Sequence, residues 1–306
     1  CFTVGEGPRM EPEVALSYVR EGKDKVLDMM INFAHMEADC FITDFLQRPF
    51  DLVKLKKAFT KWQTKMYGKG WNALYMENHD HPRIISRYGS EKYRVESGKS
   101  IAASYLFQRG TPFVYQGQEI GMINTPLASL DDYKDIMIKN NARIARSLGL
   151  SKETVLKLAQ KASRDNARTC MQWSGAPNAG FTNGKPWFVV NSNYKDINVE
   201  SQLDDPGSIL NFYRDALQFR RDNPVVIYGD YVEHMPKSKE LYVYERNLAG
   251  KKLLVICSYS EKCVRFDAPE GITLDETKQV FGNYDNNFVI SNGFTTRPYE
   301  MRVYLF

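Results

Sequence analysis

An apolar run that ends in polar residues and a proline constrains the fold of this chain more than any other feature. Ala73–Met76 is short, apolar and partly aromatic, which is typical of one buried β-strand. Asn78, His79 and Asp80 follow, and Pro82 cannot donate a hydrogen bond to a continuing sheet ladder. Such residues are also common in ordinary turns. A buried strand that delivers polar side chains at its carboxyl end is, however, typical of the catalytic edge of an α/β barrel.

Strands of this kind alternate with helical segments through the first part of the chain. The four predicted strands are Cys1–Val4, Leu27–Phe33, Ala73–Met76 and Pro112–Tyr115. Such alternation predicts a parallel sheet with right-handed crossovers. Four units make half of an eight-stranded barrel, so we predict an α/β fold in which residues 1–224 form half of a (β/α)8 barrel.

The sequence pattern changes after Pro224. Short alternating runs, separated by Gly, Asn and Asp, replace the strand–helix pattern. The predicted strands are Tyr228–Tyr231, Leu241–Glu245, Lys252–Ser258, Val264–Phe266, Gln279–Phe281 and Arg302–Phe306. Runs of this length and spacing predict that residues 225–306 form an antiparallel all-β sandwich domain.

Composition excludes several classes of protein. Of the 306 residues, 43% are apolar, enough for a large core in one or two domains. The net charge is +4 and the charges are spread along the chain, which argues against a nucleic-acid partner. No apolar run approaches the roughly 20 residues of a membrane span, so no membrane partner is expected. The five cysteines lack the spacing of a zinc site or a disulfide framework, and we expect reduced thiols in a cytoplasmic protein.

Four short motifs stand near the predicted strand ends or in the polar segment that follows them. They are Thr-Val-Gly-Glu at Thr3–Glu6, Asn-His-Asp-x-Pro-Arg at Asn78–Arg83, the run Gly110–Met122, and Ser-Arg-Asp-x-x-Arg-Thr-Cys-Met-Gln-Trp at Ser163–Trp173. Together they resemble the α-amylase clan, glycoside hydrolase family 13, and within it the α-glucosidase and oligo-1,6-glucosidase branch. Cys170 stands where that branch usually has proline. The resemblance covers nearly the whole chain but only the latter part of a family enzyme, and it implies barrel strands 5 to 8 followed by the family's C-terminal β-domain.

The resemblance also implies a role for each of several polar residues. Glu6 is expected to be the general acid/base of a retaining glycoside hydrolase, and Asp80 a catalytic carboxylate that accepts hydrogen bonds from sugar hydroxyls. His79 and Arg164 are expected to bind the terminal glucose, with Arg168 supporting Arg164. A site of this kind implies exo-action on short α-glucosides, so the expected partner is a glucose-containing oligosaccharide.

Part of the family's machinery is not expected in this chain. The resemblance places the nucleophilic Asp upstream of Cys1, and a family metal site, if any, would lie there too, so no cofactor is expected here. Met137 replaces the Glu that usually ends an Asp-x-Glu loop. We therefore expect the chain alone to be inactive. The outer strands, Cys1–Val4 and Pro112–Tyr115, are expected to be covered by an N-terminal piece or by self-association.

Three other interpretations share most of these motifs. A transglucosylating relative, such as a trehalose synthase or a sucrose isomerase, would keep the same site. The heavy chain of amino-acid transporters is a binding scaffold in the same clan, but that group tends to lose catalytic residues, whereas this chain retains Glu6, His79, Asp80 and Arg164. The third interpretation is a non-functional structural piece of an enzyme.

Overall fold

The computed structural model describes residues 1–22, 25–41, 43, 45–285 and 292–306. Its first part contains strands in parallel pairs, connected by helices. These strands are β1 (Val4–Gly7), β2 (Met29–Asn32), β3 (Ala73–Leu74) and β4 (Thr111–Pro112). The connecting helices are α1 (Pro12–Val19), α2 (Leu52–Met66), α3 (Ile84–Tyr88) and α4 (Arg94–Leu106).

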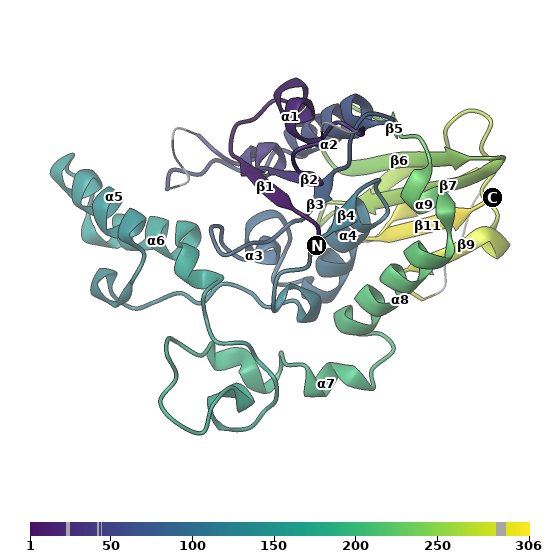
Figure 1. Ribbon diagram of the computed structural model, residues 1–306. Coiled ribbons are helices and arrows are strands. Elements are labelled where there is room, and N and C mark those ends of the chain that lie inside the picture. Colours follow the sequence, from purple (N-terminus) through teal and green to yellow (C-terminus); the bar gives the residue numbers. More distant parts are fainter. Residues whose placement is uncertain (23–24, 42, 44, 286–291) are drawn as a thin grey trace.

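The four strands lie side by side in chain order. β1 pairs with β2 and β3 pairs with β4, both in parallel, and a parallel bridge between Met30 and Asn72 joins the two pairs. Figure 1 shows them near the centre of the molecule, with β1 and β4 at the outside. The predicted parallel arrangement of these strands is confirmed.

The first strand begins and ends three residues later than predicted. β1 spans Val4–Gly7 rather than Cys1–Val4, so Glu6 lies in the strand and not in the turn after it. Gly5, the second residue of β1, allows a close approach of the neighbouring chain. A Cβ atom at Gly5 would lie 2.6 Å from Leu27 Cδ1 and 2.8 Å from Met30 Sδ. Glycine fits at this position in β1 because the side chains of Leu27 and Met30 occupy the space that a larger residue would need.

A largely helical segment follows β4. Its helices are α5 (Ile136–Ser147), α6 (Lys152–Ala162), α7 (Glu200–Leu203), α8 (Ile209–Asp222) and α9 (Pro224–Tyr228). The 3₁₀ turns of this segment are η2 (Gln118–Ile120), η3 (Leu130–Asp132), η4 (Arg164–Asn166), η5 (Pro177–Gly180) and η6 (Ser192–Lys195). Elsewhere, η1 (Ala34–Glu37) follows β2 and η7 (Glu276–Lys278) precedes β9. Ser151 caps α6, because its side chain accepts a hydrogen bond from the Thr154 amide. Figure 1 shows α5 and α6 on the opposite side of β1–β4 from the C-terminal strands.

The C-terminal part is antiparallel, as predicted. Its strands are β5 (Val232–His234), β6 (Leu241–Leu248), β7 (Lys251–Ser258), β8 (Val264–Asp267), β9 (Gln279–Gly282), β10 (Gly293–Thr296) and β11 (Met301–Leu305). Five of them form a sheet in the order β5-β6-β7-β11-β9, and β8 pairs with β10. The strand predicted at Tyr228–Tyr231 is wrong. Tyr228 is instead the last residue of the short helix α9, which begins at Pro224, and the first strand of this part starts at Val232.

The larger antiparallel sheet is apolar on both faces. Side chains alternate along a strand, and in β6 Tyr242 and Tyr244 belong to the main core while Leu241 and Val243 belong to a second cluster. The second cluster also contains Phe266 of β8 and side chains of β10 and β11. The smaller β8–β10 pair therefore covers one face of the sheet.

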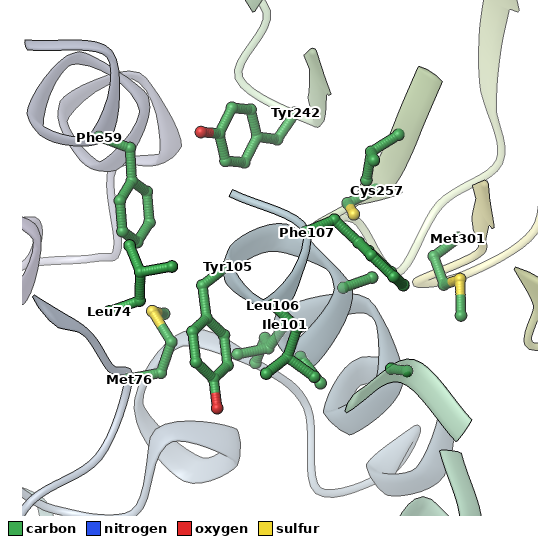
Figure 2. Packing of buried hydrophobic residues seen from close by; sticks show 14 of the residues in the cluster. Phe59, Leu74, Met76, Ile101, Tyr105, Leu106, Phe107, Tyr242, Cys257 and Met301 are labelled. Atoms are coloured by element: carbon green, nitrogen blue, oxygen red, sulfur yellow. The ribbon is translucent and has the colours of Figure 1, made fainter. Parts of the chain in front are cut away.

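Helix α4 covers the other face and joins the two parts of the molecule. Figure 2 shows Ile101, Tyr105 and Leu106 of α4 in the same apolar cluster as Leu74 of β3 and Cys257 of β7. Every residue of α4 from Ser97 to Leu106 is buried. One continuous core thus runs from the parallel strands through α4 to the antiparallel sheet.

Candidate functional site

A cleft of about 730 Å³ opens at the carboxyl ends of β1, β2 and β3. It is lined by Glu6, Pro8, Arg9, Phe33, Met36, Glu37, Cys40, Thr43, Asp80, His81, Met137, Asn141 and Arg164. These residues come from the strand ends, from η1, from α5 and from η4. The carboxyl ends of parallel strands meet at one edge of a sheet, so polar residues far apart in the sequence face one hollow.

Glu6 and Asp80 line this same cleft, although 73 residues separate them in the chain. Glu6 is the third residue of β1, and its strand partner is Ile31 of β2. Its side chain is exposed. Asp80 follows β3 and is about one-third exposed. The pairing of β1 with β2, and the bridge from β2 to the start of β3, bring the two carboxylates to the same opening.

The turn that carries Asp80 is held by side-chain hydrogen bonds. Asn78 Oδ1 accepts a hydrogen bond from the Asp80 amide at 2.9 Å, which is an Asx turn. Below it, Glu77 is fully buried and forms an ion pair with Arg83 at 2.9 Å. The second oxygen of Glu77 accepts a hydrogen bond from the Ile84 amide at 2.8 Å. Burial raises the pKa of Glu77, and the Arg83 charge opposes that shift. This buried pair fixes both ends of the turn.

Three cationic or titratable side chains surround the Asp80 carboxylate. Arg164 Nη1 lies 3.3 Å from Asp80 Oδ1, and Arg168 Nη2 lies 3.1 Å from the same oxygen. His79 Nε2 lies 3.4 Å from Asp80 Oδ2. Arg168 also donates to the His79 carbonyl at 2.9 Å. Asp80 and these three residues, four of the five predicted site residues, therefore lie together.

Two of these residues lie differently from the sequence expectation. His79 was expected to face the sugar, but its side chain is 63% exposed and does not line the cleft. Arg168 was expected to support Arg164, but it contacts Asp80 directly. In the tight turn at Asn78–Asp80, the His79 side chain lies against Asp80 on the solvent side, and Arg168 binds both the His79 carbonyl and the Asp80 carboxylate.

Asp135 is a member of this network that the sequence interpretation missed. Its side chain is completely buried and lies 2.6 Å from Arg164 Nη2 and 3.0 Å from Arg164 Nε. Burial by itself raises the pKa of Asp135, but the hydrogen bonds and charge of Arg164 outweigh it and hold the pKa below its usual value. Asp135 also caps α5, accepting from the Met137 amide at 3.0 Å. The signal that could have found it is its place directly before a helical stretch, where Asp is a preferred capping residue.

A buried histidine also lines the cleft and was not predicted. His81 is 6% exposed, and neither ring nitrogen has a hydrogen-bond partner among the described residues. Burial lowers its pKa well below the usual value, with Arg87 and other nearby charges adding to the effect. His35 is buried between Phe59 and Tyr75, and burial lowers its pKa to about 3. Both imidazoles are therefore neutral near pH 7.

The described ranges contain neither a cluster of metal-binding side chains nor a helix suited to a membrane. No group of three or more His, Cys, Asp or Glu side chains there is arranged to hold a metal ion. Within the same ranges, no helix has the length and apolar character needed to cross a membrane.

The parallel strands, the cleft at their carboxyl ends and its acidic residues match a known class of proteins. The family profile described as "Alpha amylase, catalytic domain" matches residues 1–229. The chain therefore belongs to the α-amylase family of glycoside hydrolases.

Within this family, several similar proteins are oligo-1,6-glucosidases. The oligo-1,6-glucosidase of Parageobacillus thermoglucosidasius is 40% identical over 99% of this chain and 54% of its own length. A trehalose-6-phosphate hydrolase of Bacillus subtilis is 36% identical, again over 99% and 54%. The chain thus spans about half the length of the curated relatives it matches.

Solved structures give the same result. The trehalose-6-phosphate hydrolase of Bacillus licheniformis superposes with a TM-score of 0.94 at 39% identity, covering 99% of this chain and 56% of that one. The isomaltulose synthase of Klebsiella sp. LX3 has a TM-score of 0.92 at 30% identity, covering 99% and 55%. The fold and the family are therefore shared with enzymes of more than one named activity.

Proposed function

We propose that this chain supplies the acid/base and glucose-binding side of a retaining, exo-acting α-glucosidase for short α-glucosides, similar to the oligo-1,6-glucosidases. The observation that carries the proposal is the placement of Glu6, Asp80 and Arg164 around one cleft. The names of the relatives support the substrate class, a glucose-containing oligosaccharide. In this proposal β1 to β4 are strands 5 to 8 of the family's (β/α)8 barrel, and residues 225–306 are its C-terminal β-sandwich domain.

The proposed roles follow from the surroundings of each side chain. Glu6 is exposed in the cleft, where it can protonate the oxygen of the departing sugar and later activate water. Asp80 is positioned by Arg164 and Arg168, and its oxygens can accept hydrogen bonds from sugar hydroxyls. Arg164, fixed by Asp135, keeps part of its guanidinium open to the cleft. Arg168 and His79 position Asp80 from its outer side.

The retaining route needs a second carboxylate about 5–5.5 Å from the acid/base. We propose that this nucleophile lies on a strand that the chain does not contain, and that the chain alone does not turn over a glucoside. The relatives' greater length supports this view.

Glucose binding and turnover by the 306-residue chain test the proposal. We expect saturable glucose binding in isothermal titration, a loss of about tenfold in affinity for Asp80→Asn, and no release of p-nitrophenol from p-nitrophenyl α-glucoside. Asp204→Asn, an exposed change outside the cleft, is the matched control. Turnover at ordinary enzyme rates contradicts the proposed inactivity, and equal binding by Asp80→Asn and the wild type contradicts the site.

A transglucosylating enzyme is the second candidate, favoured by the likeness to isomaltulose and trehalulose synthases. The hydrolase and the transglucosylating enzyme can be distinguished by assaying the longest native polypeptide that contains this chain. Incubation with isomaltose, maltose and sucrose is followed by NMR of the products. Glucose as the main product supports hydrolysis, and rearranged disaccharides support transfer.

A further inference from the structure

Arg9 is the cleft residue that the proposed function leaves unexplained. It lies three residues after Glu6, in the turn that leaves β1, and lines the same hollow. Its φ is 55°, in the left-handed region that residues with a Cβ rarely adopt. A long cationic side chain is thus held at the cleft in a conformation that suits glycine, and strained positions of this kind gather at functional sites.

The cleft's other arginine is already occupied. Arg164 is bound by Asp80 and by the buried Asp135. Arg9, by contrast, has no ion pair or hydrogen bond to any residue within the described part of the chain. Its guanidinium carries five N–H donors and no acceptor, so it is available to a ligand that supplies oxygen acceptors or negative charge.

The proposed function, on which this inference rests, indicates which part of a substrate Arg9 meets. Glu6 protonates the glycosidic oxygen, which is the boundary between the terminal glucose and the leaving sugar. Asp80 and Arg164 hold the glucose side. Arg9 belongs to the Glu6 loop rather than to the Asp80 network, so we place it beside the leaving sugar.

We propose that Arg9 binds a phosphate on the leaving sugar, so that the cleft prefers phosphorylated α-glucosides to neutral ones. Guanidinium matches phosphate oxygens with two parallel hydrogen bonds, and the pair is stronger than a contact between guanidinium and a neutral hydroxyl. The carboxylates of Glu6 and Glu37 line the same cleft and repel an anion, so Arg9 is the charge that admits one.

Binding of glucose 6-phosphate and glucose to this chain tests the proposal. By isothermal titration we expect glucose 6-phosphate to bind about tenfold more tightly than glucose, and less so as salt is raised. Arg9→Ala removes this difference and leaves glucose binding unchanged, whereas Arg9→Lys keeps part of it. Arg20→Ala, which removes an exposed arginine outside the cleft, keeps the full preference.

Arg9→Gly guards against a loss caused by misfolding. Glycine adopts a φ of 55° without strain, so this variant is expected to unfold at the same or a higher temperature than the wild type while losing the phosphate preference. Glucuronate, which carries a carboxylate in place of the phosphate, is the chemical control. Weaker binding of glucuronate than of glucose 6-phosphate supports the proposal, and equal binding overturns it in favour of a general anion site.

The remaining outcomes distinguish this inference from the proposed function. Glucose binding with no phosphate preference, or a preference that survives Arg9→Ala, overturns the role of Arg9 alone. Failure of the chain to bind either sugar overturns the role of Arg9 and the proposed sugar site together.

Discussion

At the scale of single residues, the site depends on a chain of opposite charges. Asp135 fixes Arg164, and Arg164 with Arg168 fixes Asp80. The innermost member, Asp135, is completely buried, while Asp80 at the cleft is one-third exposed. The buried partner therefore determines where the exposed carboxylate lies.

Asp135→Asn tests the inner link. Asparagine keeps the shape and can still accept from the Met137 amide, but it leaves Arg164 without its buried anion, so we expect about 2 kcal/mol less stability at pH 7. The folded pKa of Asp135 lies below the unfolded one, so its contribution is present above pH 4 and is lost as the pH falls through the folded pKa. Urea unfolding of the variant and the wild type at pH 7 and pH 3 measures the loss of stability and its dependence on pH. A difference between variant and wild type that is as large at pH 3 as at pH 7 contradicts the ion-pair account.

Gly110 is a second position where one residue type is required. Gly110 directly precedes β4 and has a φ of 145°. A Cβ at this position would lie 2.5 Å from the carbonyl oxygen of Asn72, which directly precedes β3. We expect Gly110→Ala to cost about 3 kcal/mol in urea unfolding, because neither backbone can move without breaking the β3–β4 pairing. Gly250→Ala is the control, since its φ is also positive but its Cβ would meet open space, and about 1 kcal/mol is expected. Equal losses would show that backbone conformation alone matters.

At the scale of elements, buried arginines join helices to strands. Arg246 of β6 is completely buried and donates to the carbonyls of Phe107, Val226, Gly229 and Asp230. Arg220 of α8 donates to the carbonyls of Leu106, Gln108 and Gly110. Arg220 therefore binds carbonyl groups at and beyond the end of α4, and Arg246 binds one there and three at and beyond the end of α9, where a helix has carbonyls without partners and favours positive charge.

Arg246→Met tests this role. Methionine fills a similar volume but leaves four buried carbonyls without their donor, so we expect a loss of about 3–5 kcal/mol in the free energy of unfolding. Arg214→Met, an exposed change on α8, is expected to stay within about 0.5 kcal/mol. A loss below 1 kcal/mol for Arg246→Met would mean that water replaces the guanidinium at the end of α4.

At the scale of the whole molecule, one core crosses the predicted boundary between residues 224 and 225. The main cluster contains Leu74 and Ile101 from the parallel part and Tyr244 and Val255 from the antiparallel sheet. The buried Arg246 adds a hydrogen bond to the Phe107 carbonyl across the same boundary. Two sequence domains that share a core are expected to unfold together.

Cooperativity across this boundary is measurable with two probes. All four tryptophans lie before residue 225, and the buried Cys257 lies in β7. We expect tryptophan fluorescence and the reactivity of the Cys257 thiol, located by mass spectrometry, to change at the same urea concentration. Two separated midpoints would show that the parts fold independently.

The outer strands give a prediction about assembly. Among the described strands, β1 pairs with β2 alone and β4 pairs with β3 alone. Phe2 beside β1 is 67% exposed. We propose that these edges associate with another copy when nothing else covers them, and that Phe2→Lys shifts light scattering toward the monomer. A wild-type chain that is monomeric at high concentration would contradict this.

The sequence by itself determined the order and direction of the strands, the antiparallel C-terminal part and the family. These features depend on local patterns, such as a short apolar run that ends at Asn78 or alternating apolar residues in β6. It also placed Glu6, Asp80 and Arg164 in one set, because their motifs resemble those of one family.

Only the tertiary structure decided which side chains meet in the cleft and how. His81 and Arg9 line the cleft and the buried Asp135 meets Arg164 behind it, because separate strands and the start of α5 converge there. The continuation of β1 through Gly5, and the exposure of His79, likewise depend on neighbours far along the chain. Long-range packing and the pairing of buried charges set these features, and neither is encoded in a short stretch of residues.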